Sequence, residues 1–268
     1  MSIRRSIAAA ALVLASSQAA KADTVYVIGG VSASPEGETS AQVTANVAAL
    51  ERARGNAVQI FADAPADVTL ADTVWDLRFY DRRGLTGSYL SYLQGGGSLI
   101  LVGENSFYAG RNDAIFGLVA QAGGGDLSYS WAPDVQTLAP EVAGGAAGAT
   151  VALTGAGGTF TPGTGRFLTT SLWGGSAIAW RPGDLTNAGA GRLTAIFDAN
   201  VLEGDRGPGA QAFAGSVIDF VASAPASDLG APVDVVDIVP TPGPATLPLL
   251  AAALGAAALV RRRRRLTV

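Results

Sequence analysis

The chain has 268 residues, of which 22 are acidic and 18 are basic, so its formal net charge is −4 at neutral pH. It contains no cysteine, which excludes disulfides, thiol nucleophiles and thiolate metal sites. It also contains no histidine, which removes the usual general base, the Ser-His-Asp triad and the usual zinc ligand. Any catalysis would have to rest on carboxylates, tyrosine, arginine or a carboxylate-bound hard metal ion. We therefore expect a protein that is not an enzyme and needs no cofactor.

The charge is distributed unevenly along the chain. All 22 acidic residues lie between Asp23 and Asp237, together with only ten arginines, so ten positive against 22 negative charges give this stretch a net charge of −12. Such an acidic surface repels nucleic acid and anionic lipid, so we expect neither as a partner.

The N-terminus has the pattern of a secretory signal peptide. Arg4 and Arg5 precede an unbroken apolar stretch at residues 7–14, and an Ala-Lys-Ala sequence ending at Ala22 supplies the small residues that a signal peptidase reads. We expect residues 1–22 to be a signal peptide that is removed when the protein is exported.

The body that follows, residues 23–226, is long enough for one domain with a sizeable core. In its first half, β-branched apolar runs alternate with stretches of helical periodicity. Strands are expected at residues 24–28, 57–62, 74–80 and 98–102, and helices at residues 39–54, 85–93 and 113–122. This alternation predicts an α/β fold with a doubly wound, mostly parallel sheet.

The second half of the body differs in composition. Residues 126–180 are rich in Gly, Thr and Ala and predict a β-rich Gly/Thr insertion, in which residues 143–165 should be flexible. The strands of this insertion are expected at residues 150–153, 166–172 and 177–180. A buried strand at residues 192–197 and an amphipathic helix at residues 210–222 complete the domain, and residues 227–239 form an extended linker.

The segment between Trp75 and Asn112 carries a recognisable order of elements. A strand and a helix lead to Gly95-Gly96-Gly97, and a second strand leads to the turn Gly103-Glu104-Asn105. This order resembles class I glutamine-amidotransferase-like, flavodoxin-like domains. Active members of that family have a cysteine on the tight turn after a central strand and a histidine later in the chain. Because this chain has neither residue, the resemblance implies the scaffold without the amidotransferase chemistry.

Polar residues follow two of the expected strands. Ligands of open α/β sheets bind beyond the carboxyl ends of the strands, where these residues should gather. The ligand-binding candidates are Asp76, Arg78, Glu104, Asn105, Arg111 and Asn112. With Trp75, Tyr80 and Tyr108 nearby, they predict a carbohydrate-binding edge, because sugars are bound by bidentate polar groups and aromatic faces.

Two alternatives stay open for these residues. In the first, Glu104 and Arg111 pair with each other and cap loops, and no ligand is involved. In the second, Asp76 and Glu104 are the paired carboxylates of an exported hydrolase that acts on a carbohydrate, since such enzymes need no histidine. Spacing along the sequence does not determine how far apart the two carboxylates lie.

A short acidic segment near the end of the body is a weaker candidate, for calcium. Its oxygen-bearing residues are Asp198, Asn200, Glu203 and Asp205. Hard cations prefer such ligands, but the spacing does not match an EF-hand loop. We interpret the segment as a solvated acidic turn and assign no metal site.

The last 30 residues have three parts. The first is a proline-rich sorting motif formed by Val239, Pro240, Thr241, Pro242 and Gly243. The second, residues 245–260, is apolar and would be about 24 Å long as a helix, shorter than the ~30 Å hydrocarbon core of a membrane. The third is a stop-transfer cluster formed by Arg261, Arg262, Arg263, Arg264 and Arg265. We expect transient insertion of the apolar part as a transmembrane helix, with the arginines on the cytoplasmic side.

This layout resembles the PEP-CTERM sorting signal of Gram-negative bacteria, with Thr241 where that family usually has glutamate. The resemblance implies that residues 240–268 are a sorting tail and that an exosortase-like membrane protease cuts it near the motif. The other partners implied are the secretion translocon and signal peptidase. A permanent C-terminal anchor in the envelope is the alternative.

Taken together, these patterns predict an exported, non-catalytic surface or matrix protein that associates with extracellular polysaccharide or biofilm. The protein would pass through an inner-membrane intermediate and reach the cell surface or extracellular matrix of a Gram-negative bacterium.

Overall fold

The computed structural model describes residues 22–30, 35–79, 85, 87–131, 135–143, 148–153, 157–204 and 208–222. All of them belong to one compact unit of the chain. The expected signal peptide, linker, sorting motif and arginine cluster lie outside the described residues, so these assignments stay predictions.

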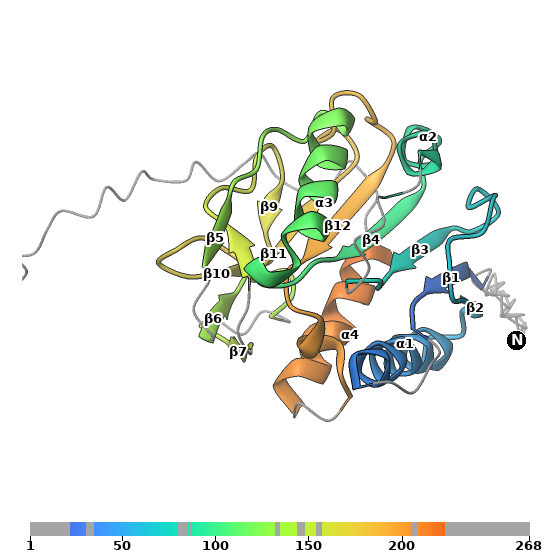
Figure 1. The fold of residues 1–268 in the computed structure, drawn as a ribbon, viewed down its shortest axis with the longest axis horizontal. Coiled ribbons are helices and arrows are strands. Elements are labelled where there is room, and N and C mark those ends of the chain that lie inside the picture. The colour runs from blue at the N-terminus through green and yellow to red at the C-terminus, as the bar shows by residue number, and fades with distance from the viewer. Residues whose placement is uncertain are drawn as a thin grey trace, which may run out of the picture. The chain divides into compact units, whose positions relative to one another are not determined.

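A seven-stranded sheet forms the centre of the described domain (Figure 1). Its five parallel strands are, in spatial order, β2 (Ala57–Phe61), β1 (Thr24–Ile28), β3 (Thr73–Asp76), β4 (Ser98–Val102) and β12 (Arg192–Ile196). Beyond β12, the sheet continues with β11 (Ala177–Trp180) and β9 (Arg166–Phe167), each antiparallel to its neighbour. The expected α/β fold with a largely parallel sheet is therefore confirmed.

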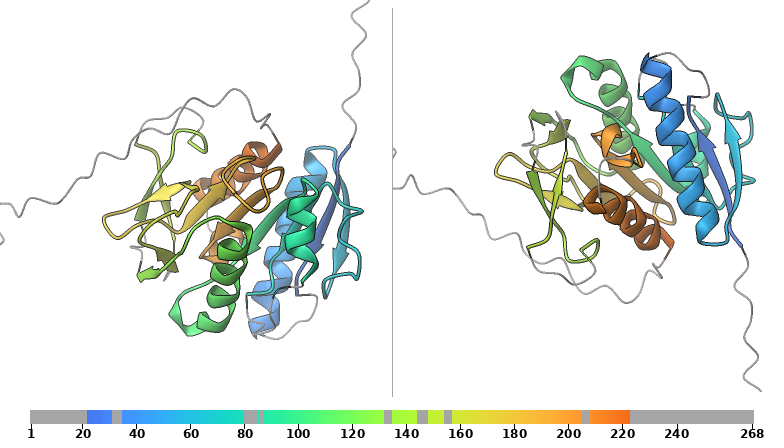
Figure 2. Two further views of the ribbon diagram at one scale, coloured as in Figure 1. Left: turned by 90° about the horizontal axis from the view of Figure 1, so that it is seen from above. Right: turned by 90° about the horizontal axis from the view of Figure 1, so that it is seen from below.

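Helices cover both faces of this sheet, as Figures 1 and 2 show. The helices are α1 (Pro35–Ala53), α2 (Ser88–Gln94), α3 (Ala109–Ala122) and α4 (Pro208–Ala222). Side chains of β1 alternate between the two faces: Val25 and Val27 pack in the core with α1 and α4, whereas Tyr26 and Ile28 pack in the core with α2 and α3. Because successive residues of a strand point to opposite faces, a run of apolar residues needs a helical layer on each side.

The β-rich section forms two small antiparallel sheets beside the main one. One contains β10 (Thr169–Thr170), β6 (Val135–Leu138) and β7 (Thr150–Ala152), and the other contains β5 (Tyr129–Trp131) and β8 (Gly157–Thr159). The sequence-based boundaries are corrected here, because β9 and β11 belong to the main sheet. The residues expected to be flexible include β7 and β8, and every residue of β8 is buried.

Several element boundaries differ from the sequence-based prediction. The strand expected at residues 74–80 ends at Asp76, because the Leu77 amide still bonds to Ile28 but the Phe79 amide turns back to the Leu77 carbonyl. The strand expected at residues 166–172 is divided at Leu168 into β9 and β10. Helix α1 begins at Pro35 rather than Thr39, since the fixed φ of proline suits the first helical position.

The expectation of a transmembrane helix is corrected. Among the residues that the structure describes, no helix is long and apolar enough to cross a membrane. Helix α1 has 19 residues but carries charged residues in its sequence, and the apolar α4 has only 15 residues, which span about 22 Å. The apolar stretch at residues 245–260 lies outside the described part of the chain.

Replacing Gly117 with alanine should stabilise the domain by about 0.5–1 kcal/mol, because glycine is unfavourable inside a helix. Gly117 lies within α3, and a methyl group there would meet no atom within 4 Å. Thermal or urea unfolding of the two proteins measures the gain. Gly97→Ala is the contrasting variant: its methyl group would collide with the Tyr92 ring, so it should destabilise the domain. Equal stability of the two variants would contradict this packing.

Candidate functional site

The carboxyl ends of the parallel strands meet at one edge of the main sheet. Strand β3 ends at Asp76, β4 is followed by Gly103 and Glu104, and β12 is followed by Phe197 and Asp198. The six ligand-binding candidates lie at this edge as expected, in two groups around Asp76 and Glu104.

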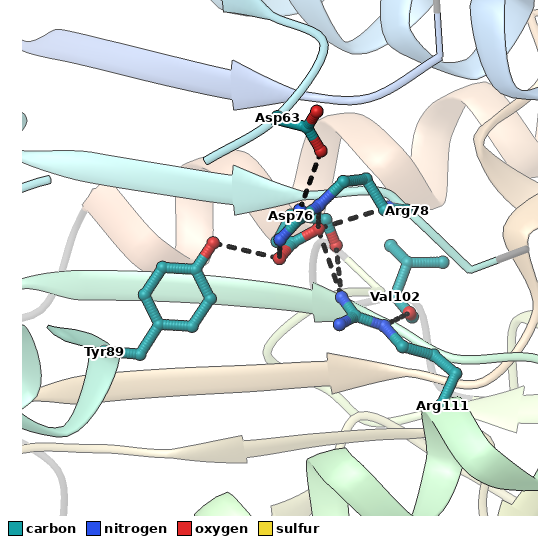
Figure 3. Close-up of polar contacts among 6 residues, drawn as sticks. All are labelled: Asp63, Asp76, Arg78, Tyr89, Val102 and Arg111. Carbon is teal, nitrogen blue, oxygen red and sulfur yellow. Dashed lines mark hydrogen bonds and ion pairs between the residues drawn. The ribbon is translucent and has the colours of Figure 1, made fainter. Parts of the chain in front are cut away.

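The Asp76 cluster consists of Asp63, Asp76, Arg78, Tyr89 and Arg111 (Figure 3). The fully buried Asp76 carboxylate accepts hydrogen bonds from Arg78 Nε at 2.9 Å, from Arg78 Nη2 at 2.6 Å and from the Tyr89 hydroxyl at 2.9 Å. Arg111 Nη2 lies 3.1 Å from Asp76 Oδ1 as an ion pair. Towards solvent, Arg78 Nη1 lies 3.4 Å from Asp63 Oδ1. One carboxylate thus joins β3 to α2 and α3.

These contacts keep Asp76 ionised. Burial alone would raise the pKa of Asp76, but the charges of Arg111 and Arg78 and the hydrogen bonds from Arg78 and Tyr89 lower it below its ordinary value. Burial and the neighbouring carboxylate raise the pKa of Tyr89, which therefore stays a protonated donor. The cluster is a buried ion network whose charged groups already have partners.

Arg111 contacts the ends of two strands rather than Glu104. Its side chain is 1% exposed, its Nε donates to the Val102 carbonyl at 3.3 Å, and its Nη2 donates to the Asp76 carbonyl at 3.4 Å. The alternative in which Arg111 pairs with Glu104 is therefore wrong. Consecutive residues of a helix point about 100° apart, so Arg111 reaches β3 while Asn112 reaches Glu104.

The Glu104 site is formed by Glu104, Asn105, Asn112, Asp198 and Glu203. Glu104 Oε1 accepts from the Asn105 amide at 2.9 Å, and Oε2 accepts from the Ala199 amide at 3.0 Å. Asn112 binds the backbone of the same turn, accepting from the Glu104 amide at 3.0 Å and donating to the Glu104 carbonyl at 2.6 Å. Asn105 caps η1 (Ser106–Tyr108) by accepting from the Phe107 amide. The side chains of this turn hold the backbone in place.

Glu104 has an unusual environment for a carboxyl group. Glu104, Asp198 and Glu203 are all buried, with exposures of 3%, 0% and 4%. Burial, followed by the negative charges of Asp198 and Glu203, raises the pKa of Glu104 to about 7, although the amides of Asn105 and Ala199 oppose this rise. Glu104 therefore exchanges its proton near neutral pH, as a general acid or a pH-sensitive structural group would.

The β-rich section covers this turn. The Gly157 amide donates to the Phe197 carbonyl at 2.9 Å, and a Cβ at Gly157 would lie 2.5 Å from the Glu104 carbonyl oxygen. Only glycine allows the two backbones to approach so closely. Burial raises the pKa of Tyr129 on the paired strand β5, and the nearby charge of Glu104 adds to the effect. Sequence reasoning missed Gly157 and Tyr129, because nothing in a Gly-rich stretch indicates which backbone it crosses.

Of the aromatic residues expected at a carbohydrate-binding edge, the two that the structure describes, Trp75 and Tyr108, pack against side chains of the protein. Trp75 is fully buried in the core on the α1 side, where its indole nitrogen donates to Glu51 Oε1 at 2.7 Å. Tyr108 packs edge-on against Phe79 with ring centres 5.9 Å apart. Tyr80 lies outside the described residues. Strand alternation explains the correction, since Trp75 and Asp76 are neighbours on one strand and must point to opposite faces.

The calcium candidates serve a structural role in the described part of the chain. Asp198 accepts from the Asn200 amide at 2.9 Å and so caps η2 (Ala199–Leu202). No group of three or more acidic side chains that could hold a metal ion is found among the described residues. Asp205 lies outside them.

A polar pocket lies at the opposite, amino edge of the sheet. It has a volume of about 420 Å³, and its walls include Asp72, Tyr92, Gly97 and Arg192. A smaller pocket of about 290 Å³ lies between α2 and α3. Neither is lined by any of the six candidates, so these two open spaces lie apart from the polar residues that the sequence singles out.

No family model matches the chain, and no curated protein matches it in sequence. The fold is similar to the N-terminal domain of mmIFT52, with a TM-score of 0.56 and 12% identity over 78% of this chain and 100% of that one. An exo-β-1,4-mannosidase from Opitutaceae bacterium strain TAV5 has a TM-score of 0.49 and 16% identity, and the match covers 74% of this chain but only 35% of the enzyme. A ThuA-like protein from Bacteroides uniformis has a TM-score of 0.46 and 12% identity over 78% of this chain and 95% of that one.

At 12% identity, the similarity to the mmIFT52 domain shows the fold alone. The similarities to the mannosidase and the ThuA-like protein have TM-scores below 0.5 and show nothing further about this chain. The class that fold and site define is therefore a mixed α/β domain with a largely parallel sheet and a buried polar network at its carboxyl edge. The matches bring no support for the signal peptide, the PEP-CTERM-like tail or the biofilm role expected from the sequence.

Proposed function

We propose that this protein is an exported, non-catalytic α/β domain that binds extracellular polysaccharide at the cell surface. The observation that supports the non-catalytic assignment is that the two candidate carboxylates at the carboxyl edge, Asp76 and Glu104, are buried and hydrogen-bonded. Asp76 and Glu104 are 0% and 3% exposed, and both carboxylates are bonded to arginine, tyrosine or backbone amide donors of the protein. A substrate cannot reach them without breaking contacts that hold the domain together.

The order of the parallel strands supports a finer proposal about the scaffold. The order β2-β1-β3-β4-β12 follows the 2-1-3-4-5 arrangement of flavodoxin-like folds, if the five parallel strands are numbered along the chain. The amidotransferase-like resemblance of residues 75–112 agrees with this arrangement. In the proposed scaffold, Glu104 occupies the turn where active members of the amidotransferase-like family have their cysteine. Its carboxylate accepts hydrogen bonds there that stabilise the turn.

The export and surface localisation of the protein are proposed from the sequence patterns at its two ends. The basic and apolar N-terminal residues resemble an export signal, and residues 240–268 resemble a PEP-CTERM sorting tail. Intact mass of the protein recovered from the surface or medium of its host tests this proposal. The expected mass is that of a chain that begins at Asp23 and ends near Pro240. A mass that includes residues 261–265 would refute the sorting step.

One observation favours the rival function, a carboxylate-based carbohydrate hydrolase. The surroundings push the pKa values of the two carboxyl groups apart, with Asp76 lowered and Glu104 raised to about 7, as in pairs that act as base and acid. We expect purified protein to release no reducing sugar from neutral polysaccharides, and Glu104→Gln to behave identically. Turnover by the native chain that is lost in Glu104→Gln would establish the hydrolase instead.

A further inference from the structure

Large apolar side chains are exposed on and beside the β-rich section. Trp131 is 59% exposed on β5, Trp173 is 59% exposed before β11, and Phe160 is 54% exposed after β8. Leu172 is 96% exposed, and Phe107 on the adjoining turn η1 is 81% exposed. The other two tryptophans of the chain, Trp75 and Trp180, are at most 1% exposed. The β5–β8 ladder and the bridge between Thr159 and Gly175 join the strand that carries Trp131 to the turn that carries Trp173. Two exposed tryptophans on joined segments indicate an interaction surface.

The backbone around both exposed tryptophans is held by strand pairing or by turn hydrogen bonds. Trp131 is paired with Gly157 in the β5–β8 ladder, and its ring packs edge-on against Tyr129 with centres 6.1 Å apart. Trp173 lies in a tight turn closed by hydrogen bonds from the Ser171 amide and hydroxyl to the Gly174 carbonyl, at 2.7 and 2.8 Å. The Trp173 amide donates to the Ser171 hydroxyl at 3.1 Å. A backbone held in this way loses little conformational entropy when a partner binds.

The chemistry around the tryptophans is uncharged and rich in hydroxyl groups. Of the 54 residues from 127 to 180, only three are charged, whereas twelve are serine or threonine. Two of the three charged residues, Glu141 and Arg166, lie 3.9 Å apart and compensate each other. Nucleic acid and anionic lipid need several lysines or arginines at their contact surface, whereas this section has only Arg166.

The same composition argues against a protein partner. Protein interfaces are enriched in arginine and methionine beside their aromatic residues, and in this section only Arg166 represents either type. Sugar rings instead present apolar C–H faces that stack on indole rings, while their hydroxyl groups exchange hydrogen bonds with serine, threonine and backbone groups. An uncharged polymer also escapes repulsion by the acidic remainder of the body.

We propose that the exposed surface of the β-rich section around Trp131 and Trp173, called the aromatic face below, binds an uncharged polysaccharide. The inference rests on the proposed polysaccharide-binding function and moves it from the carboxyl edge of the sheet, where the sequence predicts it, to the insertion. Stacking on two exposed indoles favours extended chains with exposed C–H faces over compact or anionic ones.

Affinity electrophoresis of the protein in gels that contain β-glucan, glucomannan or dextran tests the proposal, with anionic alginate as the comparison. Retardation by at least one neutral polymer and none by alginate is expected. Trp131→Ala and Trp173→Ala should each weaken the apparent affinity about tenfold, a loss of about 1.4 kcal/mol. Leu70→Ala is the matched control, because Leu70 is 68% exposed outside this section, between β2 and β3. It should migrate like the native protein.

Tryptophan fluorescence gives a second readout, since only the two exposed indoles can be covered by a ligand. A shift to shorter wavelength on adding the retarding polymer is expected, and it should vanish in the double variant. Circular dichroism and the melting temperature verify that the variants remain folded.

Three results would overturn the proposal. If the double variant binds as well as the native protein, polysaccharide binding stands but this face is not its site. If no neutral polymer retards the native protein, the proposed function falls together with the site. If the native chain self-associates in sedimentation velocity and the tryptophan variants do not, the face is a protein interface.

Discussion

Replacing Asp76 with alanine is expected to destabilise the domain by about 3–5 kcal/mol, because two buried arginines lose the carboxylate that compensates them. Arg78 and Arg111 are 8% and 1% exposed, so water cannot take the place of Asp76. Small domains have only about 5–15 kcal/mol of stability, so this one change removes a large part of it. Urea unfolding followed by circular dichroism measures the loss, and the melting temperature should fall by on the order of 10 °C.

The matched control for this variant is Asp63→Ala. Asp63 meets the same arginine, Arg78, but its side chain is 58% exposed, so the pair is screened by water and should contribute at most about 1 kcal/mol. A second test places Arg111→Met in the Asp76→Ala background, where removing the unpaired charge should restore part of the lost stability. A loss below about 1 kcal/mol for Asp76→Ala, or no recovery in the double variant, would contradict a compensated ion network.

The domain is expected to lose stability as the pH rises from about 5 to 8, and Glu104 is the cause. Its pKa is about 7 in the folded domain against an ordinary 4.5, so the folded state holds this proton more tightly than the unfolded chain. The stabilisation is complete below pH 4.5 and is lost as the pH rises through 7. It amounts to about 3 kcal/mol. Most proteins with paired carboxylates show the opposite slope at acidic pH.

Glu104→Gln tests this assignment, because glutamine cannot ionise beside Asp198 and Glu203. The variant should lose much less free energy of unfolding between pH 5 and 8 than the native protein, and any slope that remains is assigned to Glu51, whose pKa is also raised by burial. At pH 5 it should be less stable than the native protein by about 1–2 kcal/mol, because both Glu104 oxygens accept amide hydrogen bonds and glutamine offers only one acceptor. The control is Asp113→Asn on the exposed side of α3, which should keep the native slope. An unchanged slope in Glu104→Gln would assign the pH dependence to other groups.

The window from pH 5 to 8 separates this effect from that of Asp76. The pKa of Asp76 is lowered in the folded domain, so its stabilisation is present at neutral pH and is lost only as the pH falls through the acidic range. Below about pH 4 the contribution of Glu104 is constant, because its carboxyl is protonated in both the folded and the unfolded state, and only the contribution of Asp76 still changes. Unfolding measured only at acidic pH would therefore report Asp76 and miss Glu104.

Much of the fold was predictable from local patterns. The bounds of β1, β4 and β11 agree with the predicted ones, because each is an apolar run whose flanking residues end the pairing. All five residues of β4 are buried, as a central strand covered by helices on both sides requires. Periodicity also predicted α1, α3 and α4, although α1 and α3 begin four residues earlier than expected.

The β-rich section was less predictable, because its strands are two to four residues long and carry glycine and threonine rather than a continuous apolar run. Their stability comes from long-range pairing, such as Ser130 with Gly158, which leaves no periodic signal in a short window. The same limitation hid the assignment of β9 and β11 to the main sheet.

By itself, the sequence determined the α/β alternation, the edge where the polar residues gather and the exclusion of histidine and cysteine chemistry. These are local or compositional properties, and they need no knowledge of long-range contacts. Only the tertiary structure decided that Arg111 pairs with Asp76 rather than Glu104, and that Trp75 is buried whereas Trp131 and Trp173 are exposed. Which side chains contact each other, and which reach solvent, depends on how distant segments pack. Asp76 and Arg111 are 35 positions apart, and no local sequence pattern indicates their contact.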